Sequence, residues 1–127
     1  MIINITLPVY FQLKNKKILV GLSWYRNAHY FESNNVKSYY HNFVELLLKG
    51  NTKKFDKYTI EYTYFYKNRL SDTNNVVTVI DKFLQDALIL CSVVKKDNVI
   101  CSVGTKINSS ILDKENPRIE VIIREVQ

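Results

Sequence analysis

The sequence of residues 58–90 changes from a period of two to a period of 3.6, and this change constrains the fold most. Over residues 58–67 the side chains alternate, and one face carries Tyr58, Ile60, Tyr62, Tyr64 and Tyr66. This alternation predicts a β-strand. Over residues 75–90 the apolar side chains recur at helical spacing, at Val76, Val79, Ile80, Phe83, Leu84, Ala87 and Leu88. We therefore expect a strand followed closely by an amphipathic helix.

Further strands and one further helix are predicted from the rest of the chain. Residues 2–7 are apolar and β-branched and end at Pro8, which predicts a first strand. A helix is expected over residues 36–49, with Ser33 or Asn34 as its N-cap and Gly50 at its end. The remaining segments are predicted as a polar turn leading into a second strand or an extended segment over 11–22, a loop over 23–27, strands over 99–103 and 118–126, and a surface loop over 108–116.

These elements predict an α/β fold of two layers, in which a mixed β-sheet carries two main helices on one face. The chain has 127 residues, which is enough to bury one core but not two. It contains no repeat, low-complexity tract or linker. We therefore expect residues 1–127 to form a single domain.

The charge balance favours a polyanionic partner. The formal net charge is +6, and neutralising phosphates with such a surface releases condensed counterions. Cys91 and Cys101 form no CxxC pair, and His29 and His41 are not spaced as zinc ligands beside them. We expect two buried, reduced thiols and no zinc. No segment is predicted to span a membrane, and no targeting segment is recognised, so we expect a cytoplasmic protein.

Polar side chains with oxygen atoms gather around the predicted helix of residues 75–90. Asp72, Asn74 and Asn75 precede it, Asp86 lies on it four residues after Lys82, and Asp97 follows it; hard cations such as Mg²⁺ prefer oxygen ligands of this kind. Each carboxylate also has an ordinary structural explanation. Asp72 is a favourable helix N-cap, although Asn74 and Asn75 compete for that place; Lys82 and Asp86 can form a surface ion pair, and Asp97 suits a turn.

The same residues carry a resemblance to the RusA family of Holliday-junction resolvases. That family has an Asp-x-Asp-Asn motif, then a helix with a lysine and an Asp-Ala-Leu step, then a later Asp-Asp. Here Asp72-Thr73-Asn74-Asn75, Lys82, Asp86-Ala87-Leu88 and Lys96-Asp97 follow that order, between Ile5-Thr6-Leu7-Pro8 near the start and Pro117 to Val121 near the end. The resemblance implies a structure-specific endonuclease that resolves four-way DNA junctions in recombination and repair.

The resemblance also implies roles for individual residues. It makes Asp72, Lys82 and Asp97 catalytic, with Mg²⁺, or Mn²⁺ in its place, bound by Asp72, Asn74, Asp86 and Asp97. It implies a homodimer with two sites, because resolution needs two symmetric incisions. A bacterial cytoplasm, or the host cytoplasm for a phage-encoded protein, suits such an enzyme.

The chain departs from the family pattern at three positions. Asn74 stands where the family has a metal-binding aspartate, which removes one negative charge from the site. Thr78 stands where the best-known members have the lysine, so Lys82 keeps roughly the same helix face about 6 Å further along the axis. Lys96 replaces the acidic neighbour of Asp97. Three explanations of Asn74 remain open: a natural variant that compensates through Asp86, a natural inactive homologue, or an engineered substitution.

The expected contacts with DNA are basic side chains, namely Arg26, Lys67, Arg69, Lys14, Lys16 and Lys17. The tyrosines of residues 58–66 are interpreted as core or subunit contacts in preference to base-stacking platforms. Two functions compete with the nuclease: an inactive junction-binding protein of the same family, and a structural protein that assembles through the tyrosine strand.

Overall fold

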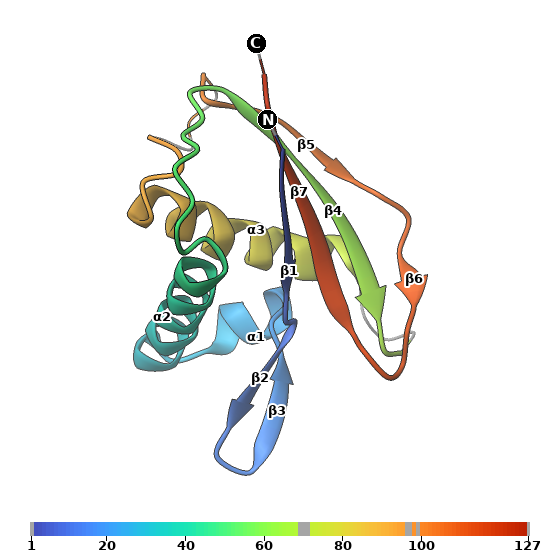
Figure 1. The fold of residues 1–127 in the computed structure, drawn as a ribbon. Coiled ribbons are helices and arrows are strands. Elements are labelled where there is room, and N and C mark those ends of the chain that lie inside the picture. The colour runs from blue at the N-terminus through green and yellow to red at the C-terminus, as the bar shows by residue number, and fades with distance from the viewer. Residues whose placement is uncertain (1, 69–71, 96–97, 99, 127) are drawn as a thin grey trace.

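The computed structural model describes residues 2–68, 72–95, 98 and 100–126, and a mixed β-sheet runs through it (Figure 1). Its strands are β1 (Ile2–Leu7), β4 (Tyr58–Tyr66), β5 (Ser102–Ile107), β6 (Ile111–Leu112) and β7 (Arg118–Glu125). The order is β1-β7-β4-β5, and β6 also pairs with β4. Strand β7 is antiparallel to β1 and β4, whereas β5 and β6 are parallel to β4.

The helices lie on one face of this sheet (Figure 1). The two main helices, α2 (Tyr30–Leu47) and α3 (Thr73–Leu90), pack against each other, and the short α1 (Leu22–Asn27) packs on α3. Strands β2 (Tyr10–Leu13) and β3 (Lys16–Leu19) form a separate antiparallel hairpin. The predicted two-layer α/β architecture is confirmed.

The core lies between the inner face of the sheet and the two main helices. Burial alternates along β1, β4 and β7, as the period of two predicts. The buried side chains of these strands are Ile3, Ile5, Leu7, Tyr58, Ile60, Tyr62, Tyr64, Ile119, Val121 and Ile123. They face the apolar stripe of α3, which includes Ile80, Phe83 and Leu84, and the residues Val36, Tyr40 and Val44 of α2.

The prediction of a loop over residues 23–27 is wrong, because Leu22–Asn27 form α1. Six residues are too few for a helix that is stable by itself. Contacts from elsewhere stabilise it, since the rings of Trp24 and Tyr25 lie 6.4 and 5.9 Å from the ring of Phe83 on α3. Tertiary packing therefore decides this element.

Helix α2 begins at Tyr30, before the predicted start, and neither Ser33 nor Asn34 caps it. The N-cap is His29, whose Nδ1 accepts a hydrogen bond from the Phe31 N–H at 3.2 Å. The Ser33 hydroxyl instead donates to the carbonyl of Tyr30 within the first turn. The predicted C-terminal end is confirmed: α2 stops at Leu47, and Gly50 follows with a φ of 82°.

The C-terminal part of the sheet also differs from its prediction. Strand β5 begins at Ser102, because the Asn98 side chain accepts hydrogen bonds from the N–H groups of Ile100 and Cys101 and holds a turn there. Val99 lies outside the described residues. The predicted surface loop over 108–116 contains β6, which pairs with the last residues of β4.

Two further expectations concern the whole chain. Cys91 and Cys101 are free thiols, as expected, but each is half-buried and not fully buried. Burial, and then the nearby charge of Glu45, raise the pKa of Cys91. Within the part of the chain that the structure describes, no helix has the length and hydropathy needed to cross a membrane.

Candidate nucleic-acid interface

Asp72 is the N-cap of α3, so the interpretation that left the cap to Asn74 or Asn75 is wrong. Its Oδ1 accepts a hydrogen bond from the Asn75 N–H at 3.2 Å, and its backbone is extended, with φ −101° and ψ 121°. An aspartate at this position accepts a hydrogen bond from one of the otherwise unpaired N–H groups of the first turn. Its negative charge also interacts favourably with the positive end of the helix dipole. Asp72 is nevertheless exposed. Its carboxylate caps the helix and still faces solvent.

Asp72 lies at the rim of a groove of about 350 Å³. The groove is lined by the end of β3, the start of α1 and the start of α3, through Ile18, Leu19, Gly21, Leu22, Ser23, Trp24, Asp72, Asn75 and Val76. Gly21 lies close to α3 here: a Cβ atom at this position would be 3.6 Å from the Val76 side chain. The groove therefore joins Asp72 to the base of the β2–β3 hairpin.

Helix α3 does not bring Lys82 and Asp86 to Asp72. At a rise of about 1.5 Å per residue, Lys82 lies about 15 Å and Asp86 about 21 Å from Asp72 along the helix axis. The ordinary alternative, a surface ion pair between Lys82 and Asp86, is not found either. Asp86 lies 3.4 Å from the Nζ of Lys37 on α2, and Lys82 is exposed and outside every ion pair of the described residues. Compensation for Asn74 by Asp86 is thus excluded by distance.

The described residues do not fit an Mg²⁺ site by themselves. Among them, Asp72 and Asn74 are the two assigned metal ligands at the start of α3, and the positive end of the helix dipole opposes a cation there. No group of three or more His, Cys, Asp or Glu side chains that could hold a metal occurs in the described ranges. Asp97, the remaining assigned ligand, lies outside the described residues, as does Arg69 among the expected DNA contacts.

The other expected DNA contacts gather around the β2–β3 hairpin. Lys14, Lys16 and Lys17 are exposed on it. Lys67, just beyond the end of β4, places its Nζ 5.9 Å from the ring centre of Tyr10 at the start of β2. Arg26 is exposed on α1, whose first residues line the groove beside Asp72. Exposed cations from three separate segments of the sequence therefore lie on the β2–β3 hairpin or on segments that adjoin it.

Two arginines on the outer face of the sheet are paired with carboxylates. Arg118 stacks over the ring of Phe65, with 3.8 Å between Cζ and the ring centre, and pairs with Asp113 and Glu120. Arg124 pairs with Glu61. The hydrogen bond from Arg118 lowers the pKa of Asp113, and hydrogen bonds from the Asn108 amide and then from Arg124 lower the pKa of Glu61. By contrast, no ion pair of the described residues uses Lys14, Lys16, Lys17, Lys67 or Arg26.

The tyrosine face of β4 belongs to the core of the monomer. Tyr58, Tyr62 and Tyr64 are buried, so they are not exposed for base stacking or for a subunit contact. The pairing of Tyr62 with α3 was not foreseen from the sequence: its hydroxyl donates to Asp81, which also accepts hydrogen bonds from the Gln85 amide at 3.1 and 3.2 Å. The i, i+4 spacing of Asp81 and Gln85 on the core side of α3 was the signal available for it.

Comparison of the sequence with known proteins found no matching protein-family model and no curated protein of significant similarity. The resemblance to the RusA family therefore rests on the residues quoted above.

Proposed function

We propose that this protein binds branched DNA, with four-way junctions as its target, through the cations of the β2–β3 hairpin and of the segments that adjoin it. The observation that supports this most is that the hairpin carrying the exposed Lys14, Lys16 and Lys17 also contacts Lys67, while the exposed Arg26 lies on α1, whose first residues share a groove with the end of β3. Within the described residues, none of these five cations has a carboxylate partner, whereas the arginines of the sheet face do. Unpaired cations gain most from neutralising phosphates, because no ion pair has to be broken first. The homodimer expected from two-fold junction symmetry is part of this proposal.

The first test is the salt dependence of junction binding after loss of the hairpin charges. We expect the triple variant Lys14→Gln, Lys16→Gln, Lys17→Gln to bind a labelled four-way junction more weakly. Its plot of log K against log salt concentration should be shallower by about 2 to 3 units, since each phosphate contact contributes roughly 0.9. Fluorescence anisotropy over a range of salt concentrations measures both quantities.

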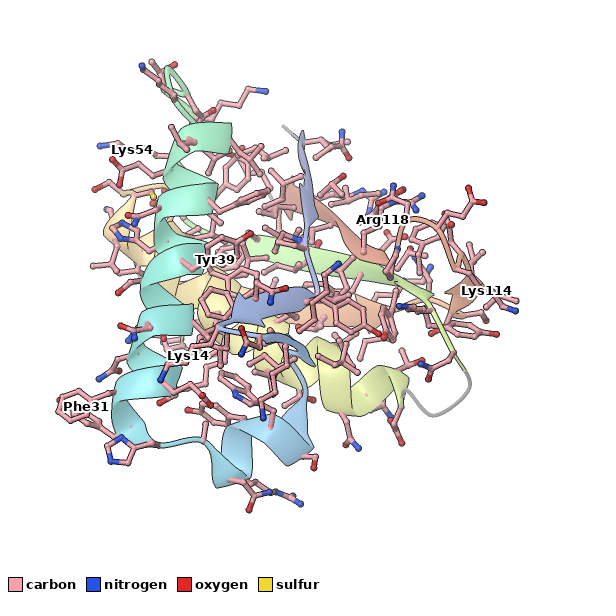
Figure 2. The ribbon with its side chains drawn as sticks, turned by 90° about the horizontal axis from the view of Figure 1, so that it is seen from below. Lys14, Phe31, Tyr39, Lys54, Lys114 and Arg118 are labelled. Carbon is pink, nitrogen blue, oxygen red and sulfur yellow. The ribbon has the colours of Figure 1, made fainter. Side chains whose placement is uncertain are left out.

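A matched control removes the same charge elsewhere. Lys49, Lys53 and Lys54 are exposed beyond the C-terminal end of α2, and Figure 2 places Lys54 towards that end and Lys14 towards the N-terminal half of the helix. The corresponding triple glutamine variant should change the slope by less than about one unit. Equal losses in both variants would mean that net charge alone attracts DNA. Salt-independent binding, or none, would favour the structural interaction protein.

The second candidate is the Mg²⁺-dependent junction endonuclease itself. It is favoured by the exposed carboxylate of Asp72 at the rim of a groove that adjoins the basic hairpin. The remote position of Asp86 counts against it, because Asn74 then has no compensating carboxylate on α3. Binding and cleavage are therefore separate questions for this chain.

Asn74→Asp should raise Mg²⁺-dependent cleavage of a four-way junction by about tenfold or more if Asp72, residue 74 and Asp97 share a cation, since it adds a charged hard ligand. The control adds Asp72→Asn to that variant, because asparagine caps a helix as well as aspartate but lacks the carboxylate. The control should lose the gain and keep its stability. No change in cleavage or in calorimetric Mg²⁺ binding on Asn74→Asp would leave the junction-binding protein as the function.

A further inference from the structure

Three neighbouring aromatic rings stand exposed at the start of α2, at His29, Tyr30 and Phe31, which we call the aromatic tip. Tyr30 is 66% exposed and Phe31 68% exposed. The Phe31 ring stacks on the His29 ring, with centres 5.3 Å apart and planes 21° apart, and lies 5.0 Å from the Tyr30 ring. Figure 2 shows Phe31 standing clear of the ribbon at this end of α2. The aromatic tip therefore presents flat apolar faces to solvent.

The aromatic tip is held in place by local hydrogen bonds. The His29 imidazole accepts from the Phe31 N–H, and the Ser33 hydroxyl donates to the Tyr30 carbonyl. Rings that already stack on one another lose little further freedom when a ligand covers them, so less ordering entropy opposes binding. The three rings of the aromatic tip are therefore already arranged as a stacking platform before a ligand binds.

The segments next to the aromatic tip carry cations. Arg26 precedes it by three residues and is exposed, while Lys14 and Lys16 of the hairpin line one groove of about 390 Å³ together with Glu32 of α2. Glu32 adds one carboxylate to this groove, and its Oε2 accepts a hydrogen bond from the Trp24 Nε1–H at 2.8 Å. With three cations against one carboxylate, the net charge of these segments is positive, which an apolar peptide or a neutral membrane would not need.

We propose that the aromatic tip stacks on unpaired bases of single-stranded DNA while Lys14, Lys16 and Arg26 bind the flanking phosphates. Stacking on aromatic side chains beside a cationic groove is the way proteins hold single strands without reading their sequence. Duplex bases are already stacked on each other, so only unpaired bases offer a free face. The inference rests on the proposed function and deepens it, because it names unpaired nucleotides as a feature that the protein recognises in branched DNA.

The test measures the binding of the full chain to a fluorescein-labelled oligothymidylate, a blunt duplex and a four-way junction by anisotropy. We expect Phe31→Ala to weaken oligothymidylate binding about five- to 150-fold, the equivalent of one stacked base. Duplex binding should change by less than about twofold, because it depends on phosphate contacts. Leu46→Ala is the matched control: Leu46 is 72% exposed on the same helix, and its loss should leave all three affinities unchanged. Phe31→Trp should retain binding.

Equal effects of Phe31→Ala and Leu46→Ala on oligothymidylate binding would overturn the inference. It would also be overturned if Phe31→Ala instead abolished self-association in sedimentation, or abolished binding to phosphatidylcholine vesicles. Failure of the proposed function would look different. If Phe31→Ala weakens oligothymidylate binding but the chain binds junction and duplex equally well, the inference stands and the proposed function is overturned. If Phe31→Ala changes neither junction binding nor oligothymidylate binding, only the inference is overturned and the proposed function stands.

Discussion

Phe83→Ala is expected to lower the free energy of unfolding by about 3–5 kcal/mol, a large part of the roughly 5–15 kcal/mol that such a domain has. Phe83 is 2% exposed and lies where three helices meet. Its ring stacks on Tyr40 of α2, with centres 5.7 Å apart, and touches Tyr25 of α1 edge-on. Alanine would remove these contacts and leave a cavity that α1 and α2 cannot both close. Urea denaturation followed by circular dichroism measures the loss.

Two variants control for this prediction. Thr78→Ala changes an exposed residue of the same helix to a better helix former, so stability should stay within about 0.5 kcal/mol. Phe83→Leu keeps most of the volume and should cost clearly less than Phe83→Ala. A loss below about 1 kcal/mol for Phe83→Ala would contradict the packing of α1 and α2 against α3 through this ring.

Above pH 10, the free energy of unfolding is expected to fall by about 2.7 kcal/mol per pH unit from two buried tyrosines together. Burial raises the pKa of Tyr40, whose hydroxyl donates to the Pro8 carbonyl at 2.6 Å, and a Coulombic interaction with Tyr39 adds to the rise. Burial, and then the charge of Asp81, raise the pKa of Tyr62 well above its ordinary value. Both hydroxyls should stay protonated in the folded chain when the unfolded chain ionises near pH 10.

The sign follows from the proton count. Above pH 10 the unfolded state binds fewer protons than the folded state, so stability is fully present below that pH and is lost as pH rises above it. Urea denaturation from about pH 8 to about pH 11 measures the slope. Tyr40→Phe should roughly halve it, whereas Tyr30→Phe, which removes an exposed hydroxyl, should leave it unchanged. If Tyr40→Phe leaves the slope of the unfolding free energy against pH unchanged, Tyr40 ionises while the chain stays folded.

The sequence alone predicted the elements whose signal is local and repeated. Strand β4 and helix α3 were placed to within two residues, because a period of two over 58–66 or of 3.6 over 73–90 describes one buried face. The apolar, β-branched run that ends at Pro8 placed β1, the strand expected over 118–126 matches β7, and these elements together predicted the two-layer fold. The surplus of positive charge could also be read from the composition, but its location could not.

Only the tertiary structure decided the features that depend on a distant partner. Helix α1 depends on Phe83, the start of α2 on an imidazole cap, and the position of Lys67 on Tyr10 in another element. The candidate site shows the same limit. Asp72 and Asp86 lie on one helix and match one motif, yet about 21 Å of axial rise separates them, and Lys37 of α2 takes Asp86 as its partner. Spacing along the chain determines which face a residue takes, whereas convergence on one ligand depends on how the elements pack.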